Sequence, residues 1–229
     1  MIDNTNKTAG VFGVRNDSSI AFAIALKLLQ SGCRVAMNYV PVTRQDVIYL
    51  MEQNGFGTSL AFEADVRDED QISAGLSAIH QAVGKFDYLL HGVAFGNHNV
   101  MCSTLPGSQE EAPSYINIPF EDFADSFNIS AYSLLRICRV AEPMLAEHAS
   151  VLTLTYNASQ RVFPNYAGMS INKAALENMV RFPLPTAVDP RGLPEGDPVD
   201  PIARKDFKKY FAGIFHQDLR RLVAATGKD

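Results

Sequence analysis

Two tyrosines and a lysine stand at a spacing that suits hydrogen-bond or proton donation to a substrate. Nine residues separate Tyr156 from Tyr166, and six separate Tyr166 from Lys173. Seven positions make about two helical turns, so Tyr166 and Lys173 share one face of a helix. On that face a lysine ammonium can hold a ribose and favour donation by a nearby phenol. A buried tyrosine beside a solvated lysine is the ordinary alternative, and the spacing by itself leaves both open.

A glycine turn near the N-terminus has features of a phosphate-binding loop. Residues 10–21 contain Gly13, then Ser19 after five residues, and Ala21 after one more. Glycine lets the backbone approach a pyrophosphate, and the helix that follows offers free N–H groups and its positive dipole end. Ser18 and Ser19 can cap that helix or bind phosphate. The spacing differs from Gly-x-Gly-x-x-Gly, so a purely structural turn is the alternative.

These residues must be positioned by alternating strands and helices. Short apolar runs predict strands over residues 8–14, 34–40, 59–66, 86–94 and 150–156. Helical periodicity predicts helices over residues 18–31, 42–54, 68–83, 120–148 and 166–182, the fourth interrupted near Asn128. Repeated β-α-β units with covered strands indicate an α/β fold with a Rossmann-like, doubly wound parallel sheet. An antiparallel α+β fold is less favoured because hairpin signals are missing.

The pattern changes after residue 182, so we expect a single domain with a truncated or remodelled C-terminal end. Residues 1–182 are expected to form a Rossmann-like, dinucleotide-binding core. Six of the twelve prolines lie in residues 183–202, and proline removes a backbone donor, so this segment is predicted to be an extended loop. Apolar residues at helical spacing predict one amphipathic helix over residues 206–226, within a segment 203–229 of the same domain.

Composition excludes several other classes of protein. The 229 residues suit one packed domain, and a formal net charge of −5 argues against a general nucleic-acid-binding surface. No signal peptide or membrane-spanning run is apparent, so we expect a cytoplasmic protein without membrane association. Cys33, Cys102 and Cys138 form no paired motif and are expected to be free thiols. The five histidines lack metal-ligand spacing, so no metal is expected.

With these motifs the sequence resembles the FabI-type enoyl-acyl-carrier-protein reductases, a divergent branch of the short-chain dehydrogenase/reductases. The family's Gly-x5-Ser-x-Ala turn and its Tyr-x9-Tyr-x6-Lys centre match the residues described above. Similar stretches occur at residues 64–66, 91–95, 128–133, 152–156 and 164–166, and the resemblance covers residues 7–181. The commoner Tyr-x3-Lys pattern is absent, because Ser170 stands at that position.

The resemblance implies an NAD(P)H-dependent oxidoreductase that passes hydride to the conjugated double bond of an enoyl thioester in fatty acid biosynthesis. Tyr166 would donate a hydrogen bond to the thioester carbonyl and stabilise the enolate, while Tyr156 would shape the pocket or assist. Lys173 would bind the nicotinamide ribose. The implied cofactor-binding residues would lie beside the pyrophosphate (Gly13, Ser19, Ala21), the adenine (Asp65, Val66) and the adenosine side and ribose (Ala94, Phe95). Lys173 would belong both to these residues and to the catalytic residues.

The sequence leaves both NADH and NADPH open as the cofactor. After the second predicted strand no Asp or Glu stands where it would hold a ribose 2′-hydroxyl, since residues 38–41 read Asn-Tyr-Val-Pro. Arg44 is near enough to meet a 2′-phosphate, which leads us to lean slightly to NADPH. A solvated Arg44 at the start of a helix is the alternative.

Departures from the family leave two other functions open. The strand, nicotinamide-binding loop and substrate helix that follow the catalytic helix in the family are not recognisable in residues 183–201. One alternative is therefore a non-catalytic cofactor-binding or partner-binding protein on the same fold. The other is a short-chain ketone reductase or alcohol dehydrogenase that uses Tyr166.

Two kinds of partner are expected beyond the small-molecule enoyl substrate. The family pairs subunits through its two long helices, here residues 120–148 and 166–182, so we expect a homodimer or homotetramer. Residues 203–229 carry seven basic and three acidic side chains. That balance suits either a solvated helix face or docking of an acidic acyl carrier protein that bears the substrate.

Overall fold

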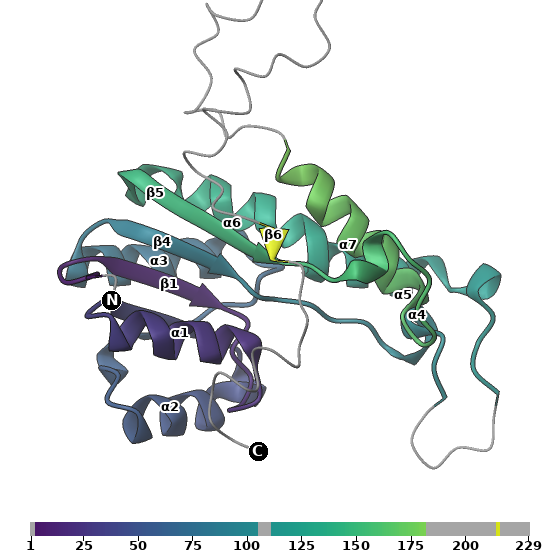
Figure 1. Cartoon of the computed structure of the whole chain (residues 1–229), viewed down its shortest axis with the longest axis horizontal. Coiled ribbons are helices and arrows are strands. Elements are labelled where there is room, and N and C mark those ends of the chain that lie inside the picture. Colours follow the sequence, from purple (N-terminus) through teal and green to yellow (C-terminus); the bar gives the residue numbers. More distant parts are fainter. Residues whose placement is uncertain (1–2, 105–110, 182–213, 216–229) are drawn as a thin grey trace, which may run out of the picture.

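A parallel β-sheet forms the centre of the molecule, in a computed structural model that describes residues 3–104, 111–181 and 214–215. The strand order is β3-β2-β1-β4-β5-β6, and each neighbouring pair is parallel (Figure 1). The predicted doubly wound α/β fold is therefore confirmed. The strands are β1 (Thr8–Phe12), β2 (Arg34–Tyr39), β3 (Ala61–Glu63), β4 (Phe86–His91), β5 (Leu145–Leu154) and β6 (Ile214–Phe215).

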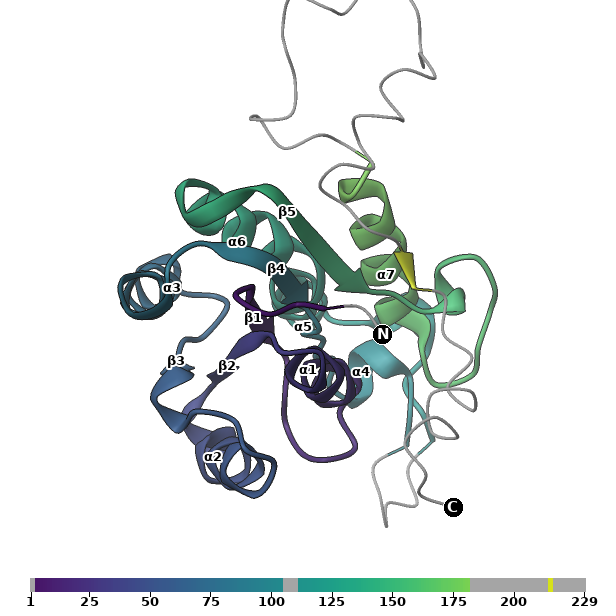
Figure 2. The same ribbon diagram turned by 60° about the vertical axis from the view of Figure 1, so that its left-hand side comes forward.

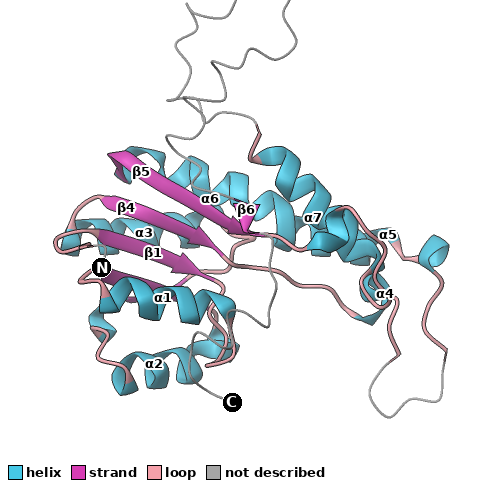
Figure 3. Ribbon diagram, in the orientation of Figure 1, coloured by secondary structure: helices cyan, strands magenta, loops and turns pink. Residues whose placement is uncertain are grey.

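Helices cover both faces of the sheet (Figure 2). α1 (Ile20–Gln30) and α2 (Arg44–Gln53) pack on one face. The opposite face carries α3 (Glu69–Val83), α6 (Ser133–Ala141) and α7 (Ala167–Met179). The short α4 (His98–Met101) and α5 (Phe120–Phe127) lie beyond the carboxyl ends of the central strands (Figure 3).

Each face of the sheet has its own apolar core, because successive residues of a strand point to opposite faces. In β1, Val11 belongs to the core under α1 and α2, and Phe12 to the core under α3, α6 and α7. All five residues of this strand are buried. The strand order reverses between β1 and β4, and ligands of such sheets bind beyond the carboxyl ends of the strands at that point.

The helix predicted over residues 120–148 is divided. α5 ends at Phe127, a π-helical turn occupies Asn128–Tyr132, and α6 follows directly from Ser133. The predicted interruption near Asn128 is confirmed. A π-helical turn inserts one extra residue into the helix, which changes the direction of the side chains that follow it.

The predicted end of that helix at residue 148 is wrong. α6 ends at Ala141, Glu142–Met144 forms a 3₁₀ turn, and β5 already begins at Leu145. Pro143 lacks the N–H group that would continue the helix. The pairing of β4 with β5 also shifts register near Leu145, and this irregularity hides the strand alternation in the sequence.

The strand predicted over residues 59–66 is shorter than expected, because Thr58–Leu60 forms a 3₁₀ turn and β3 covers only Ala61–Glu63. The predicted loop over residues 183–202 lies outside the described residues. So does the predicted helix over residues 206–226, apart from Ile214–Phe215. At these two residues the helix prediction is wrong, because they pair with the last residues of β5 as β6 and fill hydrogen-bonding positions at its edge.

Candidate active site

The two predicted tyrosines come together at the carboxyl end of β5. Tyr156 follows the strand, and Tyr166 directly precedes α7. Their ring centroids lie 5.1 Å apart with an interplanar angle of 70°, an edge-to-face contact. Phe163 also packs on Tyr156, with the two ring centroids 4.9 Å apart. The loop between the tyrosines thus folds back and makes a small aromatic cluster.

Lys173 is buried on α7, with 5% of its surface exposed. Its Nζ donates a hydrogen bond to the carbonyl of Leu154 at 2.8 Å, which uses one of the three ammonium hydrogens. Burial lowers the pKa of Lys173 to about 8, and the nearby negative charge of Glu177 opposes that fall. The alternative of a solvated lysine is therefore excluded, and the bond to Leu154 places the ammonium group beside the carboxyl end of β5.

Tyr166 is a persistent hydrogen-bond donor. Burial, together with the neighbouring Tyr156, raises its pKa to about 12, because a phenolate would be poorly solvated there. The hydroxyl therefore keeps its proton at neutral pH. A phenol O–H in a partly dry site stabilises negative charge that develops on a substrate oxygen.

The glycine turn is built for close approach of backbone segments. Gly13 has φ +98°, and a Cβ placed there would lie 2.4 Å from both the carbonyl carbon and the oxygen of Gly92. The Ser19 hydroxyl accepts hydrogen bonds from the backbone N–H groups of Arg15 and Asn16, each at 3.0 Å. Ser19 thus orders the loop, and the predicted capping of α1 by its side chain is not observed. Ala21 is buried in the first turn of α1, whose initial N–H groups have no intrahelical acceptor.

The segment after β3 carries Asp65 and Val66, the residues expected beside the adenine. A hydrogen bond from Arg67, at 2.7 Å to the Nη2 atom, lowers the pKa of Asp65. The Val66 carbonyl accepts a hydrogen bond from Arg136 Nη1 at 2.7 Å. Arg136 also donates to the Asn128 side chain at 2.9 Å, so it joins this segment to the π-helical turn. Arg136 was not identified as a site residue from the sequence, because the Val66 carbonyl that it binds is 70 residues away in the chain.

The segment after β4 is held by serines of the interrupted helix. The Phe95 carbonyl accepts from the hydroxyls of Ser126 at 2.6 Å and Ser130 at 3.0 Å, and the Phe95 N–H donates back to Ser130 at 2.9 Å. Asn172 of α7 donates to Ser126 at 2.8 Å. Ala94 and the Phe95 side chain remain exposed. The backbone at the expected ribose position is therefore fixed while its outer surface is open.

His91 was not identified as a site residue from the sequence, and in the structure both of its ring nitrogens are hydrogen-bonded. It is buried at the end of β4, with Nδ1 2.8 Å from Thr153 Oγ1 and Nε2 2.8 Å from Ser133 Oγ. Burial, together with the nearby charge of Lys173, lowers its pKa to about 3. Each ring nitrogen thus hydrogen-bonds a hydroxyl, and these hydroxyls also donate to the Ile129 and His91 carbonyls. His91 stays neutral and is not a proton source at neutral pH.

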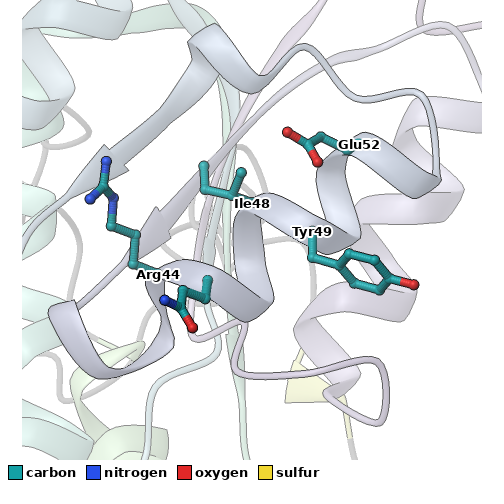
Figure 4. A pocket seen from close by; sticks show the side chains of 5 residues that line it. Arg44, Ile48, Tyr49 and Glu52 are labelled. Atoms are coloured by element: carbon teal, nitrogen blue, oxygen red, sulfur yellow. The ribbon is translucent and has the colours of Figure 1, made fainter.

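Arg44 lies apart from the tyrosines and lysine, at the exposed start of α2. Together with Gln45, Ile48, Tyr49 and Glu52 it lines an open groove along that helix (Figure 4). Figure 4 shows Arg44, Ile48 and Glu52 spaced along one side of the helix. The arginine is thus solvated, as the alternative interpretation of its role expected.

The described residues contain neither a membrane-spanning helix nor a metal-binding cluster. No described helix is long and apolar enough to span a membrane. Within residues 3–104, 111–181 and 214–215, no cluster of His, Cys, Asp and Glu side chains could hold a metal ion. The three cysteines are free, and burial raises the pKa values of Cys33 and Cys138 to about 11 and about 12. These two thiols stay protonated at neutral pH and are poor nucleophiles.

Comparisons with known proteins agree on one family. A family model described as enoyl-(acyl carrier protein) reductase matches residues 13–183. The chain is 36% identical over 186 residues to the enoyl-[acyl-carrier-protein] reductase [NADH] FabI of Synechocystis, covering 80% of this chain and 67% of that protein. It is 34% identical over 172 residues to the protein of the same name from Rickettsia typhi, covering 75% and 62%.

Solved structures give the same answer. The reductase of Anaplasma phagocytophilum in complex with NAD superposes with a TM-score of 0.70 at 30% identity, over 79% of this chain and 66% of that one. The NADH-named reductase of Aquifex aeolicus gives a TM-score of 0.69 at 27% identity, over 78% and 66%. The chain thus spans about two thirds of the length of the proteins it matches. The relatives are named for NADH, so they do not support the lean to NADPH.

Proposed function

The chain belongs to the enoyl-(acyl carrier protein) reductase family, and from that membership we propose that it is an NADH-dependent enoyl reductase acting on enoyl thioesters. The observation that carries the proposal is the edge-to-face pair of Tyr156 and Tyr166 together with the buried ammonium group of Lys173, which all lie at the carboxyl end of β5. β5 neighbours β4, and nucleotide ligands in sheets of this kind bind where the strand order reverses between β1 and β4.

The described residues fit a nicotinamide dinucleotide. At Gly13 any side chain would overlap the backbone of Gly92, so glycine lets the turn after β1 pack directly against the segment after β4 at the point where the strand order reverses. The first N–H groups of α1 point out of the same turn and supply the positive end of the helix dipole. Lys173 retains two ammonium hydrogens for ribose hydroxyls after its bond to Leu154. Asp65 and Val66 line the adenine side, with Val66 fixed by Arg136.

When bound, the nicotinamide supplies the hydride that adds to the β-carbon of the enoyl thioester. Negative charge then develops on the thioester oxygen, and the Tyr166 hydroxyl donates to that oxygen. Tyr156 packs edge-to-face against Tyr166 and fixes the direction of its ring. Protonation of the α-carbon completes the reduction. His91 takes no part in it, because it is neutral and its two ring nitrogens are occupied.

The proposal is tested first by cofactor titration. We expect NADH to bind at least about tenfold more tightly than NADPH, a difference of about 1.4 kcal/mol, because the relatives are named for NADH. Nicotinamide fluorescence measures both affinities, and the chain contains no tryptophan that would interfere. A panel of enoyl thioesters and small ketones then follows, with turnover expected only for the enoyl thioesters.

The outcomes separate the candidate functions. Saturable NADH binding without turnover of any enoyl thioester would favour the non-catalytic protein on the same fold. Turnover of ketones in place of enoyl thioesters would favour a short-chain ketone reductase. Failure of a folded sample to bind either nucleotide would remove the reductase proposal altogether.

The proposed partners are an acyl carrier protein and a second copy of the chain, in a cytoplasmic setting compatible with the three free cysteines. Relatives are named for acyl-carrier-protein substrates. Apolar side chains lie exposed on the helices expected to pair subunits, with Phe120 74%, Leu135 37% and Ile171 40% exposed. We therefore expect light scattering to give at least twice the 25.1 kDa mass of one chain. A monomeric mass at micromolar concentration would contradict this.

A further inference from the structure

Helix α7 carries two buried charges that contact one short segment of chain. Lys173 and Glu177 are 5% and 4% exposed. Lys173 donates to the carbonyl of Leu154. Glu177 Oε1 accepts from the hydroxyl of Thr155 at 2.7 Å and from that of Ser159 at 2.6 Å. Lys173 thus donates to one carbonyl and Glu177 accepts from two hydroxyls, and all three groups belong to residues 154–159.

The contacted segment carries Tyr156. Thr155 directly precedes it, and the Ser159 N–H donates to the Tyr156 carbonyl at 3.0 Å. Glu177 therefore hydrogen-bonds the residues at both ends of the turn that carries Tyr156, Thr155 before it and Ser159 after it. The Tyr156 ring in turn packs against Tyr166. A displacement of the carboxylate would be transmitted to the aromatic pair through these contacts.

The negative charge of Glu177 requires its own explanation. Both hydroxyls donate to the same oxygen, and the amide oxygen of a glutamine would accept them equally well. Burial of a carboxylate costs far more than burial of an amide. In the described part of the chain the ion pairs within 4 Å are Arg67–Asp65, Arg67–Asp125 and Arg139–Glu69, so Glu177 has no direct cationic partner there.

Two cations stand four residues from Glu177: Lys173, one turn earlier on α7, and Arg181, which is exposed beyond the end of the helix. Of the two, Lys173 is the buried one. The other titratable groups around this lysine are uncharged at neutral pH. His91 of β4 has a pKa of about 3 and is neutral, and Tyr166 has a pKa of about 12 and keeps its proton. Among the described groups, Glu177 is thus the one that favours the ammonium form of Lys173.

We propose that Glu177 is a positioning residue for the site: its buried carboxylate holds the Tyr156 segment on α7, and its charge keeps Lys173 in the ammonium form that binds ribose. The ribose part of this inference rests on the proposed function. The charge state of Lys173 does not, so the two can be tested apart. The substitution Glu177→Gln separates charge from shape, because it keeps the acceptor oxygen and removes the charge.

The direct test follows the Lys173 side chain by NMR of protein carrying ¹³Cε-lysine, with the signal assigned from its loss in Lys173→Met. We expect Glu177→Gln to lower the pKa of Lys173 by at least about half a unit. Glu147→Gln, at an exposed glutamate of β5, is the matched control and should leave that pKa unchanged. An unaltered Lys173 pKa in Glu177→Gln, or an equal fall in the control, would overturn the proposal.

A second readout is the pH dependence of NADH affinity. From a pKa of about 8, a fall of one unit would make the protonated lysine about eightfold rarer at about pH 8.5, and only about a fifth rarer at about pH 6.5. Affinity in Glu177→Gln should therefore approach that of the wild type in acid and fall below it in alkali. A loss of affinity that is equal at all pH values would indicate a merely structural residue and contradict the charge role. If wild type itself binds no NADH, the proposed function fails while the NMR result still decides the role of Glu177.

Discussion

Replacement of Tyr166 by phenylalanine should lower the turnover of an enoyl thioester by about a hundredfold and leave the affinity for NADH within about twofold. The phenol hydroxyl is the donor to an oxygen that becomes negative only as hydride arrives, so its removal affects the transition state more than binding. Phenylalanine keeps the edge-to-face contact with Tyr156, whose centroid is 5.1 Å away. Steady-state kinetics with a crotonyl thioester and fluorescence titration of NADH measure the two effects.

Tyr156→Phe is the matched comparison, because it removes the other hydroxyl of the same aromatic pair. We expect a loss of turnover of about tenfold or less, since this tyrosine shapes the pocket and Tyr166 donates. Unchanged turnover in Tyr166→Phe would contradict the assigned donor. A larger loss in Tyr156→Phe than in Tyr166→Phe would exchange the two roles.

Burial changes the pKa values of the two ionisable residues of the site in opposite directions. Tyr166 keeps its proton until about pH 12, and Lys173 loses its charge near pH 8, both because of burial. Burial therefore favours the neutral form of each group, which suits the tyrosine as a donor but works against the lysine as a cation. The carboxylate of Glu177 corrects only the second effect, which is why its place one turn beyond Lys173 matters.

Much of this site could be predicted from local sequence patterns. Helical periodicity predicts Tyr166 and Lys173 on one helix face; in the structure Lys173 lies in α7, whereas Tyr166 directly precedes the helix, and both are at least partly buried. The glycine turn at Gly13 was also identified from its place between a strand and a helix. These features depend on residues close together in the chain, where strand and helix periods apply directly.

The parts that the sequence did not predict depend on tertiary contacts. Glu177 acts through hydroxyls 22 and 18 residues away, and Arg136 binds a carbonyl 70 residues away. His91 reads as one more residue of an apolar strand until Thr153 and Ser133 are placed beside it. Strand or helix periodicity in the sequence cannot predict these contacts, because they depend on how β4, β5 and the helices pack together.

Replacement of Gly13 by alanine should abolish measurable NADH binding and lower the melting temperature by about 10 °C. The backbone there has φ +98°, which costs an alanine about 1–2 kcal/mol. The added Cβ would also lie 2.4 Å from the Gly92 carbonyl and 2.8 Å from the Val93 nitrogen, so two backbone segments must separate. Together these effects destabilise the fold by about 3 kcal/mol or more. Thermal melting and fluorescence titration at neutral pH measure both losses.

Gly55→Ala is the control that has backbone strain without a steric clash. Gly55 has φ +77°, but nothing lies within 4 Å of an added Cβ. This substitution should cost only about 1 kcal/mol, equal to about 3 °C, and leave NADH affinity unchanged. If Gly13→Ala is too unstable to purify, Ser19→Ala removes the hydroxyl that orders the same loop and should weaken NADH binding by about fivefold without a backbone clash. Normal NADH affinity in a folded Gly13→Ala protein would show that this turn does not hold the pyrophosphate, since the displaced backbone could no longer cradle it.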